Sequence, residues 1–295
     1  MTARLRLARL AIPLLLLVAF LPAAAQTGGM QSGPFDGMSS EIVVPAAVRV
    51  DGKNGAFFQT DLWIRCRTVP VAATLYFHAA DAASEAPAVT VPMTLTQPVV
   101  YLPDVLSATF GVPKGAGNIR IVAGAPVSAV VRVYNNGSGG AFGLSFMGMP
   151  STMSLRSMPM MGGSFDMDDF AMYMLGLLPE PGNRVNVSVV NTNSTTVSGV
   201  VEILDSDGST PSGTGAASLP FQIAGYSSHQ FNDVLANIHS RFGIGDTGLQ
   251  VRVRLNQGSA GMVMAYAVVN DNATNDGYVV MGTMMNGGRG MGMMP

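Results

Sequence analysis

The chain has 295 residues, of which 48% are hydrophobic and only 12% are charged, and its formal net charge is -2. An ordinary domain has about 25% charged residues. The chain is therefore too apolar for a disordered tail and too neutral for a nucleic-acid-binding protein, which needs clustered positive charge. A single cysteine excludes a scaffold held together by disulfides.

Residues 1–25 have the three-part pattern of a secretory signal peptide. Arginines at positions 4, 6 and 9 precede a short apolar run, Leu10–Leu21, which is followed by an A-x-A cleavage site at Ala23–Ala25. The alternative is an uncleaved N-terminal anchor, although the run is shorter than the roughly 20 residues that span a bilayer. The pattern predicts an extracytoplasmic protein, periplasmic or secreted.

Cleavage would also change the charge balance. Removing the three arginines from the 16 basic residues leaves 13 against 18 acidic residues, a charge of -5. Such a chain does not attract nucleic acid or anionic lipid. No later segment has 18 consecutive apolar residues, so we expect no membrane span after signal cleavage.

From Ile42 onward the sequence consists of short apolar or alternating runs that are separated by turn residues. These runs are rich in Val, Ile, Thr, Tyr and Phe, and they lie at 42–50, 57–66, 71–78, 118–124, 127–135, 184–191, 197–204, 218–224, 249–255 and 261–270. Repeated runs of strand length with turn signals are typical of an antiparallel sandwich. We therefore predict an all-β fold of two tandem antiparallel β-sandwich domains with an N-terminal signal peptide.

Changes in composition set the expected boundaries. After the signal peptide (1–25), we expect a flexible segment (26–41), a first sandwich (42–149), a Met/Gly-rich linker (150–170), a second sandwich (171–283) and a flexible Met/Gly-rich tail (284–295).

The two expected sandwiches share an order of motifs. Asp104-Val105-Leu106 and Asp233-Val234-Leu235 are each followed by a short amphipathic stretch, a Phe-Gly pair and a Gly-led strand. We interpret the halves as two copies of one sandwich. In each, the Asp-Val-Leu segment is expected to form a short helical turn, with Asp capping the turn and the apolar residues closing the core edge.

The first half is similar to the tandem immunoglobulin-like β-sandwich repeats of exported bacterial proteins. The motifs that carry the resemblance are Phe58-Gln59-Thr60-Asp61-Leu62-Trp63, the Asp104-Val105-Leu106 segment, Arg132-Val133-Tyr134-Asn135 and Gly140-Ala141-Phe142-Gly143. The resemblance is good over about 45–149 and weak over 183–283, where the aromatic opening is missing. It implies architecture and location, and no catalytic role.

The sequence offers little for catalysis. His78, His229 and His239 do not form a zinc pattern, there is no G-x-S-x-G elbow, and Cys66 ends an alternating strand as a small buried residue would. We predict that the protein is not an enzyme and that it needs no cofactor.

Methionine is the unusual feature of the composition. Nine of the 21 methionines lie in residues 147–174 and six in the last fifteen residues. Closely spaced thioethers suit Cu(I), so the candidate metal ligands are Met158, Met160, Met161, Met291, Met293 and Met294. The alternative is that methionine fills irregular apolar surface in loops.

Two further patterns have ordinary structural explanations. The segments 205–209 and 270–277 offer Asp and Asn oxygens for calcium, but such residues are also typical of hairpin turns, which we favour. Arg252 and Arg254 alternate with apolar residues, as on a solvated sheet face, and the same face could bind a partner.

These patterns favour an exported, non-catalytic structural, adhesive or binding protein of the bacterial cell surface or periplasm. The expected partner is a protein or glycan at the cell surface, with association between copies through unpaired strand edges. The alternatives are a periplasmic copper-binding protein that uses the Met clusters and an accessory module of a secreted hydrolase.

Overall fold

The computed structural model describes residues 37–52, 55–137, 140–156, 170–177, 182–204, 218–236, 249–272 and 277–286. Gly37–Pro295 form one compact unit. Almost all regular structure in the described residues is antiparallel β-sheet, with one short α-helix, so the all-β prediction is confirmed.

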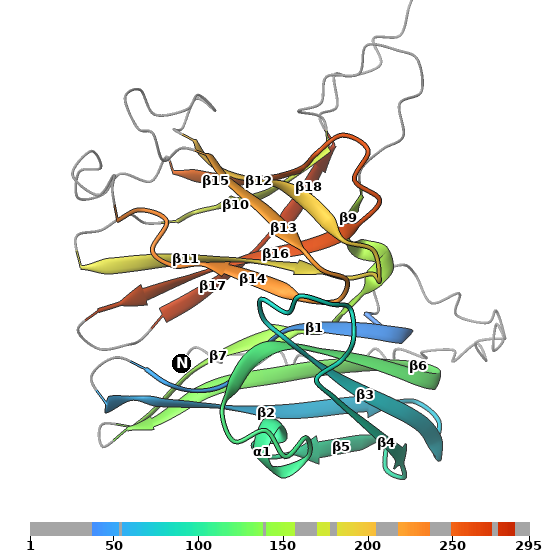
Figure 1. Cartoon of the computed structure of the whole chain (residues 1–295). Helices are drawn as coiled ribbons and strands as arrows, with labels where there is room; N and C mark the ends of the chain where they lie inside the picture. Colours follow the sequence, from blue (N-terminus) through green and yellow to red (C-terminus); the bar gives the residue numbers. More distant parts are fainter. Residues whose placement is uncertain are drawn as a thin grey trace, which may run out of the picture. The chain divides into compact units, whose positions relative to one another are not determined.

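The first half of the fold contains eight strands and the helix (Figure 1). The elements are β1 (Ser39–Asp51), β2 (Phe57–Cys66), β3 (Val71–Ala79), β4 (Val89–Leu95), β5 (Val99–Leu102), α1 (Val105–Ala108), β6 (Gly115–Gly137), β7 (Gly140–Met147) and β8 (Met149–Pro150), followed by a 3-10 turn (Ser151–Met153).

The second half contains the remaining strands. They are β9 (Leu155–Arg156), β10 (Phe170–Leu175), β11 (Asn183–Asn191), β12 (Val197–Leu204), β13 (Ser218–Ile223), β14 (Ser228–Phe231), β15 (Gln250–Leu255), β16 (Met262–Asp271), β17 (Gly277–Met281) and β18 (Thr283–Asn286).

Strand β6 takes part in two sets of pairings. Its first part pairs with β1 and β3, and its second part pairs with β2 and β7. The sequence pattern predicts two strands here, at 118–124 and 127–135, and the structure instead forms one continuous strand. The pairing order is β4-β3-β6-β1-β8 through its first part and β5-β2-β6-β7 through its second.

The second half pairs its strands in the same order, with β15 and β16 in place of the two parts of β6. One sheet has the order β13-β12-β15-β10-β18, and the other has the order β14-β11-β16-β17, with β9 added beside β16. Part of the expected linker is therefore regular structure, because β8 pairs with β1 and β9 pairs with β16. Strand β18 likewise extends the sheet into the expected tail.

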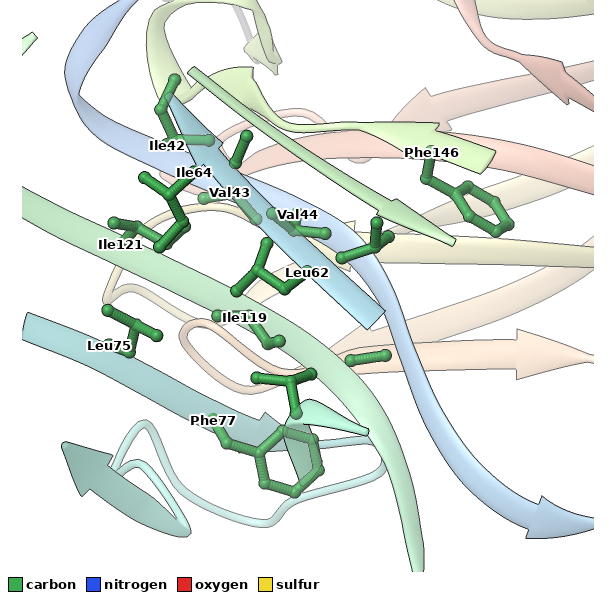
Figure 2. Packing of buried hydrophobic residues seen from close by; sticks show 14 of the residues in the cluster. Ile42, Val43, Val44, Leu62, Ile64, Leu75, Phe77, Ile119, Ile121 and Phe146 are labelled. Carbon is green, nitrogen blue, oxygen red and sulfur yellow. The ribbon is translucent and has the colours of Figure 1, made fainter. Parts of the chain in front are cut away.

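The core of the first half lies between its two sets of strands (Figure 2). Alternate residues of each strand point inward, as period-2 patterning requires, and they are almost completely buried. They include Leu62, Ile64, Leu75, Phe77, Ile119 and Ile121. Helix α1 closes one end of this core with Val105 and Leu106, and Phe110 follows them, as the Asp-Val-Leu motif predicts.

The two halves are in contact through side chains and backbone. Val190, Met264 and Tyr266 of the second half belong to the same apolar cluster as the core of the first, and the Tyr266 ring meets Phe146 edge-on at 5.1 Å. A short parallel bridge joins Ala80 to Ser228. The contact therefore combines apolar burial with main-chain hydrogen bonding.

Candidate functional site

The outer face of the strands β5, β2, β6 and β7 has an unusual set of exposed side chains. Successive residues of a strand point to opposite faces, so the buried positions of Leu62 and Ile64 place Trp63 on the outer face. Trp63 lies opposite Tyr101 on β5 and opposite Val130 on β6, and Val130 lies opposite Met147 on β7. We call Tyr101, Trp63, Val130 and Met147 the apolar stripe.

The apolar stripe is open to solvent. Tyr101 is 50% exposed, Val130 38% and Met147 66%, and the Trp63 and Tyr101 rings stack with centroids 4.9 Å apart. Eight large hydrophobic side chains are exposed among the described residues, and four of them (the three just named and Val99) lie on this face. A gathering of exposed apolar side chains with a polar border is typical of an interaction site.

Asp61 lies beside the stripe and holds its polar border together. Although Asp61 is buried, its carboxylate accepts hydrogen bonds from the Tyr101 hydroxyl at 3.0 Å, the Asp104 backbone N–H at 2.9 Å and the Tyr134 hydroxyl at 3.3 Å. Arg132 lies opposite Asp61 on β6, and its guanidinium is 5.1 Å from the centre of the Tyr134 ring. These contacts fix the orientation of Tyr101 and hence of the ring stacked on it.

The pKa values of both tyrosines reflect Asp61. The hydrogen bond to Asp61 is the main cause that raises the pKa of Tyr101 above its ordinary value. Burial, followed by the charge of Asp61, raises the pKa of Tyr134. Both hydroxyls therefore stay protonated at neutral pH and act as donors to the carboxylate.

Asp104 begins helix α1 in a way that the sequence does not predict. Its backbone has a positive φ of 39° and its side chain makes no capping hydrogen bond, so the expected side-chain cap is wrong. The carboxylate instead accepts hydrogen bonds from Arg49 Nε, at 3.0 and 3.1 Å, and from Gln59 Nε2. The N–H group of Asp104 is satisfied by Asp61, which ties the helix to β2.

This face combines apolar and aromatic surface with charged groups. The side chains of the stripe and its border are aromatic, aliphatic, carboxylate and guanidinium groups, and the two carboxylates are already engaged by donors. Among the described residues, no group of three or more His, Cys, Asp or Glu side chains could hold a metal ion. No described helix is both long and apolar enough to cross a bilayer.

The candidate copper ligands are not among the described residues. They are Met158, Met160, Met161, Met291, Met293 and Met294. Met147 and Met149 have the same close spacing but different surroundings: Met147 belongs to the exposed stripe, whereas Met149 packs partly against the core. The first calcium-like segment, 205–209, also lies outside the described residues, and Asn272 of the second accepts a hydrogen bond from Arg184.

Cys66 is buried, as its place in the sequence pattern predicts. Its thiol donates to the carbonyl oxygen of Gln97 at 3.3 Å. The cysteine therefore acts as a small core residue that also holds the β4–β5 turn.

Arg252 and Arg254 are less solvated than their alternating pattern predicts. Both donate to the carboxylate of Glu202 on the neighbouring strand, at 2.6–2.8 Å, and the Glu202 side chain is only 10% exposed. Burial by itself would raise the pKa of Glu202, but hydrogen bonds from Arg254 and Arg252 outweigh it and keep that pKa below its usual range. This face of the second half therefore carries a tightly paired charge cluster.

Two of the three histidines of the chain lie among the described residues, in different surroundings. His229 contacts Asp81 at 2.5 Å across the contact between the halves, and His239 lies outside the described residues. His78 is 2% exposed, its ring lies 5.2 Å from that of Tyr226 in the second half, and its Nε2 has no hydrogen-bond partner in the part of the chain that the structure describes. Burial, reinforced by the charge of Arg120, lowers the pKa of His78 from 6.5 to about 4.

We expect His78 to make the fold sensitive to acid. Its pKa is lower in the folded than in the unfolded chain, so the unfolded state binds the proton first and stability falls as the pH drops from about 6.5 towards 4. With a discount for solvent that reaches the site, the loss is about 2 kcal/mol. Urea unfolding at pH 7 and pH 4.5 should show this fall in the wild type and a smaller one in His78→Gln. An equal fall in both would contradict the assignment.

The sequence contains only part of the signal for the apolar stripe. The alternation of β2 places Asp61 and Trp63 on one face, but Tyr101, Val130 and Met147 join them only through the register of the pairs β2–β5, β2–β6 and β6–β7.

Comparisons of the chain with protein-family models, with curated proteins and with solved structures found no match.

Proposed function

We propose that this protein is an exported, non-catalytic binding protein of the cell surface or periplasm, and that the apolar stripe binds a partner protein. The observation that carries the proposal is the row of exposed Tyr101, half-buried Trp63, exposed Val130 and exposed Met147 beside the buried Asp61 network. We further infer that the two halves are copies of one immunoglobulin-like sandwich. The signal-peptide pattern of residues 1–25 supports export. The shared strand order supports the repeat of one sandwich.

The geometry favours a protein partner over a glycan. A sugar ring usually stacks on an open aromatic face, whereas Trp63 and Tyr101 cover one face of each other, with only 23° between their planes. Val130 and Met147 continue the row with aliphatic and thioether surface, which packs well against apolar side chains. The aromatic and methionine content also matches the composition of interface centres.

Site-specific photo-crosslinking in cells that express the full chain tests this function. A photoreactive phenylalanine analogue at Val130 should form a protein adduct, and the recovered protein should begin at Gln26 and fractionate outside the cytoplasm. The same analogue at Thr94, which is exposed on β4 and lies off the stripe, is the matched control. The absence of any protein adduct from position 130, or adducts of equal yield from both positions, would refute a binding role for the stripe.

A further inference from the structure

The two halves can be compared residue by residue through one shared hydrogen bond. Asp61 Oδ1 accepts from the backbone N–H of Asp104, and Asn186 Oδ1 accepts from the backbone N–H of Asp233, in both cases at 2.9 Å. Asp104 and Asp233 both have a positive φ, 39° and 44°. Asp61 therefore corresponds to Asn186, and Trp63, two residues further along β2, corresponds to Ser188 on β11.

The apolar stripe consequently has a counterpart in the second half. Ser188 lies opposite Gln230 on β14 and Tyr266 on β16, and Tyr266 lies opposite Met281 on β17. Part of this counterpart row is covered within the chain by the first half, whereas Gln230 on β14 is exposed. Tyr266 is only 7% exposed and packs against Phe146, and Met281 packs partly against the core of the first half.

Another part of the contact between the halves involves the outer face of β1, β3 and β6 in the first half. Arg120, on the central strand, donates to Glu41 at 2.8 Å and lies 5.1 Å from the Tyr76 ring. The ring of Tyr226, from the second half, stacks over the same guanidinium at 4.5 Å. Asn118 donates to the carbonyl oxygen of Tyr226 at 2.8 Å, so the two halves are held in a specific register.

The matching sheet of the second half also has Arg, Glu and Tyr side chains on one face, although Glu and Tyr are on exchanged strands. Arg252 on its central strand β15 donates to Glu202 on β12 and lies opposite Tyr173 on β10. Two residues beyond Tyr173, on the same face of β10, Leu175 is 44% exposed. Each half therefore has one outer face with Arg, Glu and Tyr side chains and a second outer face with the stripe or its counterpart row. In the counterpart row, only Tyr266 and Met281 are apolar.

From this correspondence, and resting on the proposed function, we propose that the partner of the apolar stripe is a second copy of this chain. The stripe of one copy docks on the β12-β15-β10 face of the next copy and repeats between chains the contact that joins the two halves within a chain. The stripe is more apolar than its partly covered counterpart, with Trp63 in place of Ser188 and Tyr101 in place of Gln230. A head-to-tail contact of this kind is heterologous, so it leaves one free face at each end and builds linear assemblies or rings.

Sedimentation velocity of the purified full chain, expressed so that its own N-terminal segment is processed, tests the proposal. The mass should rise with concentration up to ~0.1 mM, a range in which even modest affinities are visible. Met147→Arg places a charge in the apolar stripe, and Leu175→Arg places a charge on the β12-β15-β10 face. Each substitution should weaken self-association by at least about 30-fold. Thr94→Arg adds the same charge off both faces and should behave as the wild type.

Mixing the two variants gives the decisive outcome. Each variant keeps one intact face, so an equimolar mixture should form a heterodimer and nothing larger, and this also shows that both variants are folded. If Leu175→Arg associates as the wild type does while Met147→Arg does not, the stripe pairs with itself and the head-to-tail arrangement is wrong. If the wild type stays monomeric while position 130 still crosslinks to another protein, this inference fails and the proposed function stands.

Discussion

Asp61→Ala should lower the free energy of unfolding by about 3 kcal/mol, because it removes the acceptor for three donors at once. The Asp104 N–H and the hydroxyls of Tyr101 and Tyr134 all donate hydrogen bonds to this buried carboxylate. Asp104 also has a positive φ, so its left-handed backbone depends on outside support. Denaturant unfolding followed by circular dichroism measures the loss.

The chain contains its own control for this prediction. Asn186 accepts a hydrogen bond from the backbone N–H of Asp233, as Asp61 does from that of Asp104. Asp61→Asn therefore retains the acceptor for the turn and should lower the free energy of unfolding by no more than about 1 kcal/mol. Asn186→Ala should in turn destabilise the second half. If Asp61→Asn were as damaging as Asp61→Ala, the turn would not depend on the backbone hydrogen bond, and the correspondence between the halves would lose its main support.

Local patterning was sufficient to locate many of the strands. The alternating run at 57–66 is strand β2 to the residue, and the run at 197–204 is strand β12. The Asp-Val-Leu segment forms the expected short helix at α1, with Val105 and Leu106 fully buried. These features depend on side chains that are close in sequence, so a window of a few residues contains the information.

Strand β10 shows where composition misleads. Its first residue, Phe170, falls in the expected Met/Gly-rich linker (150–170), and none of the predicted strand runs includes its residues. Met172 and Met174 are nevertheless core residues, and Tyr173 between them points to the other face. The thioether fills the core as well as a branched residue would. A Met-rich composition therefore hides a period-2 pattern over residues 172–175, in which Met172 and Met174 are buried and Leu175 is exposed.

The apolar stripe and the contact between the halves depend on register, which no local pattern contains. Trp63 meets Tyr101 only because β2 and β5 pair in one particular alignment, and a slip of one residue would place the two rings on opposite faces of the sheet. Arg252 and Glu202 likewise lie 50 residues apart, so the alternation of β15 alone indicates a solvated arginine.

Gly117→Ala should be among the most destabilising single changes in the protein, at about 3 kcal/mol or more. Gly117 lies on β6 between Ala47 of β1 and Ala79 of β3. A Cβ at this position would lie 2.0 Å from the carbonyl oxygen of His78, which is backbone and cannot rotate away. One of the paired strands must therefore shift.

That shift should also loosen the contact between the halves, because the neighbouring residue Asn118 donates to the carbonyl oxygen of Tyr226 and His78 packs against the Tyr226 ring. Gly124→Ala is the matched control on the same strand: its nearest neighbour is a carbonyl oxygen at 3.6 Å, an ordinary contact. Gly124→Ala should change stability by less than about 1 kcal/mol, if anything favourably. Urea unfolding of both variants separates steric crowding at position 117 from a general cost of replacing strand glycines, and equal losses would show that the close approach of β3 and β6 is not what position 117 requires.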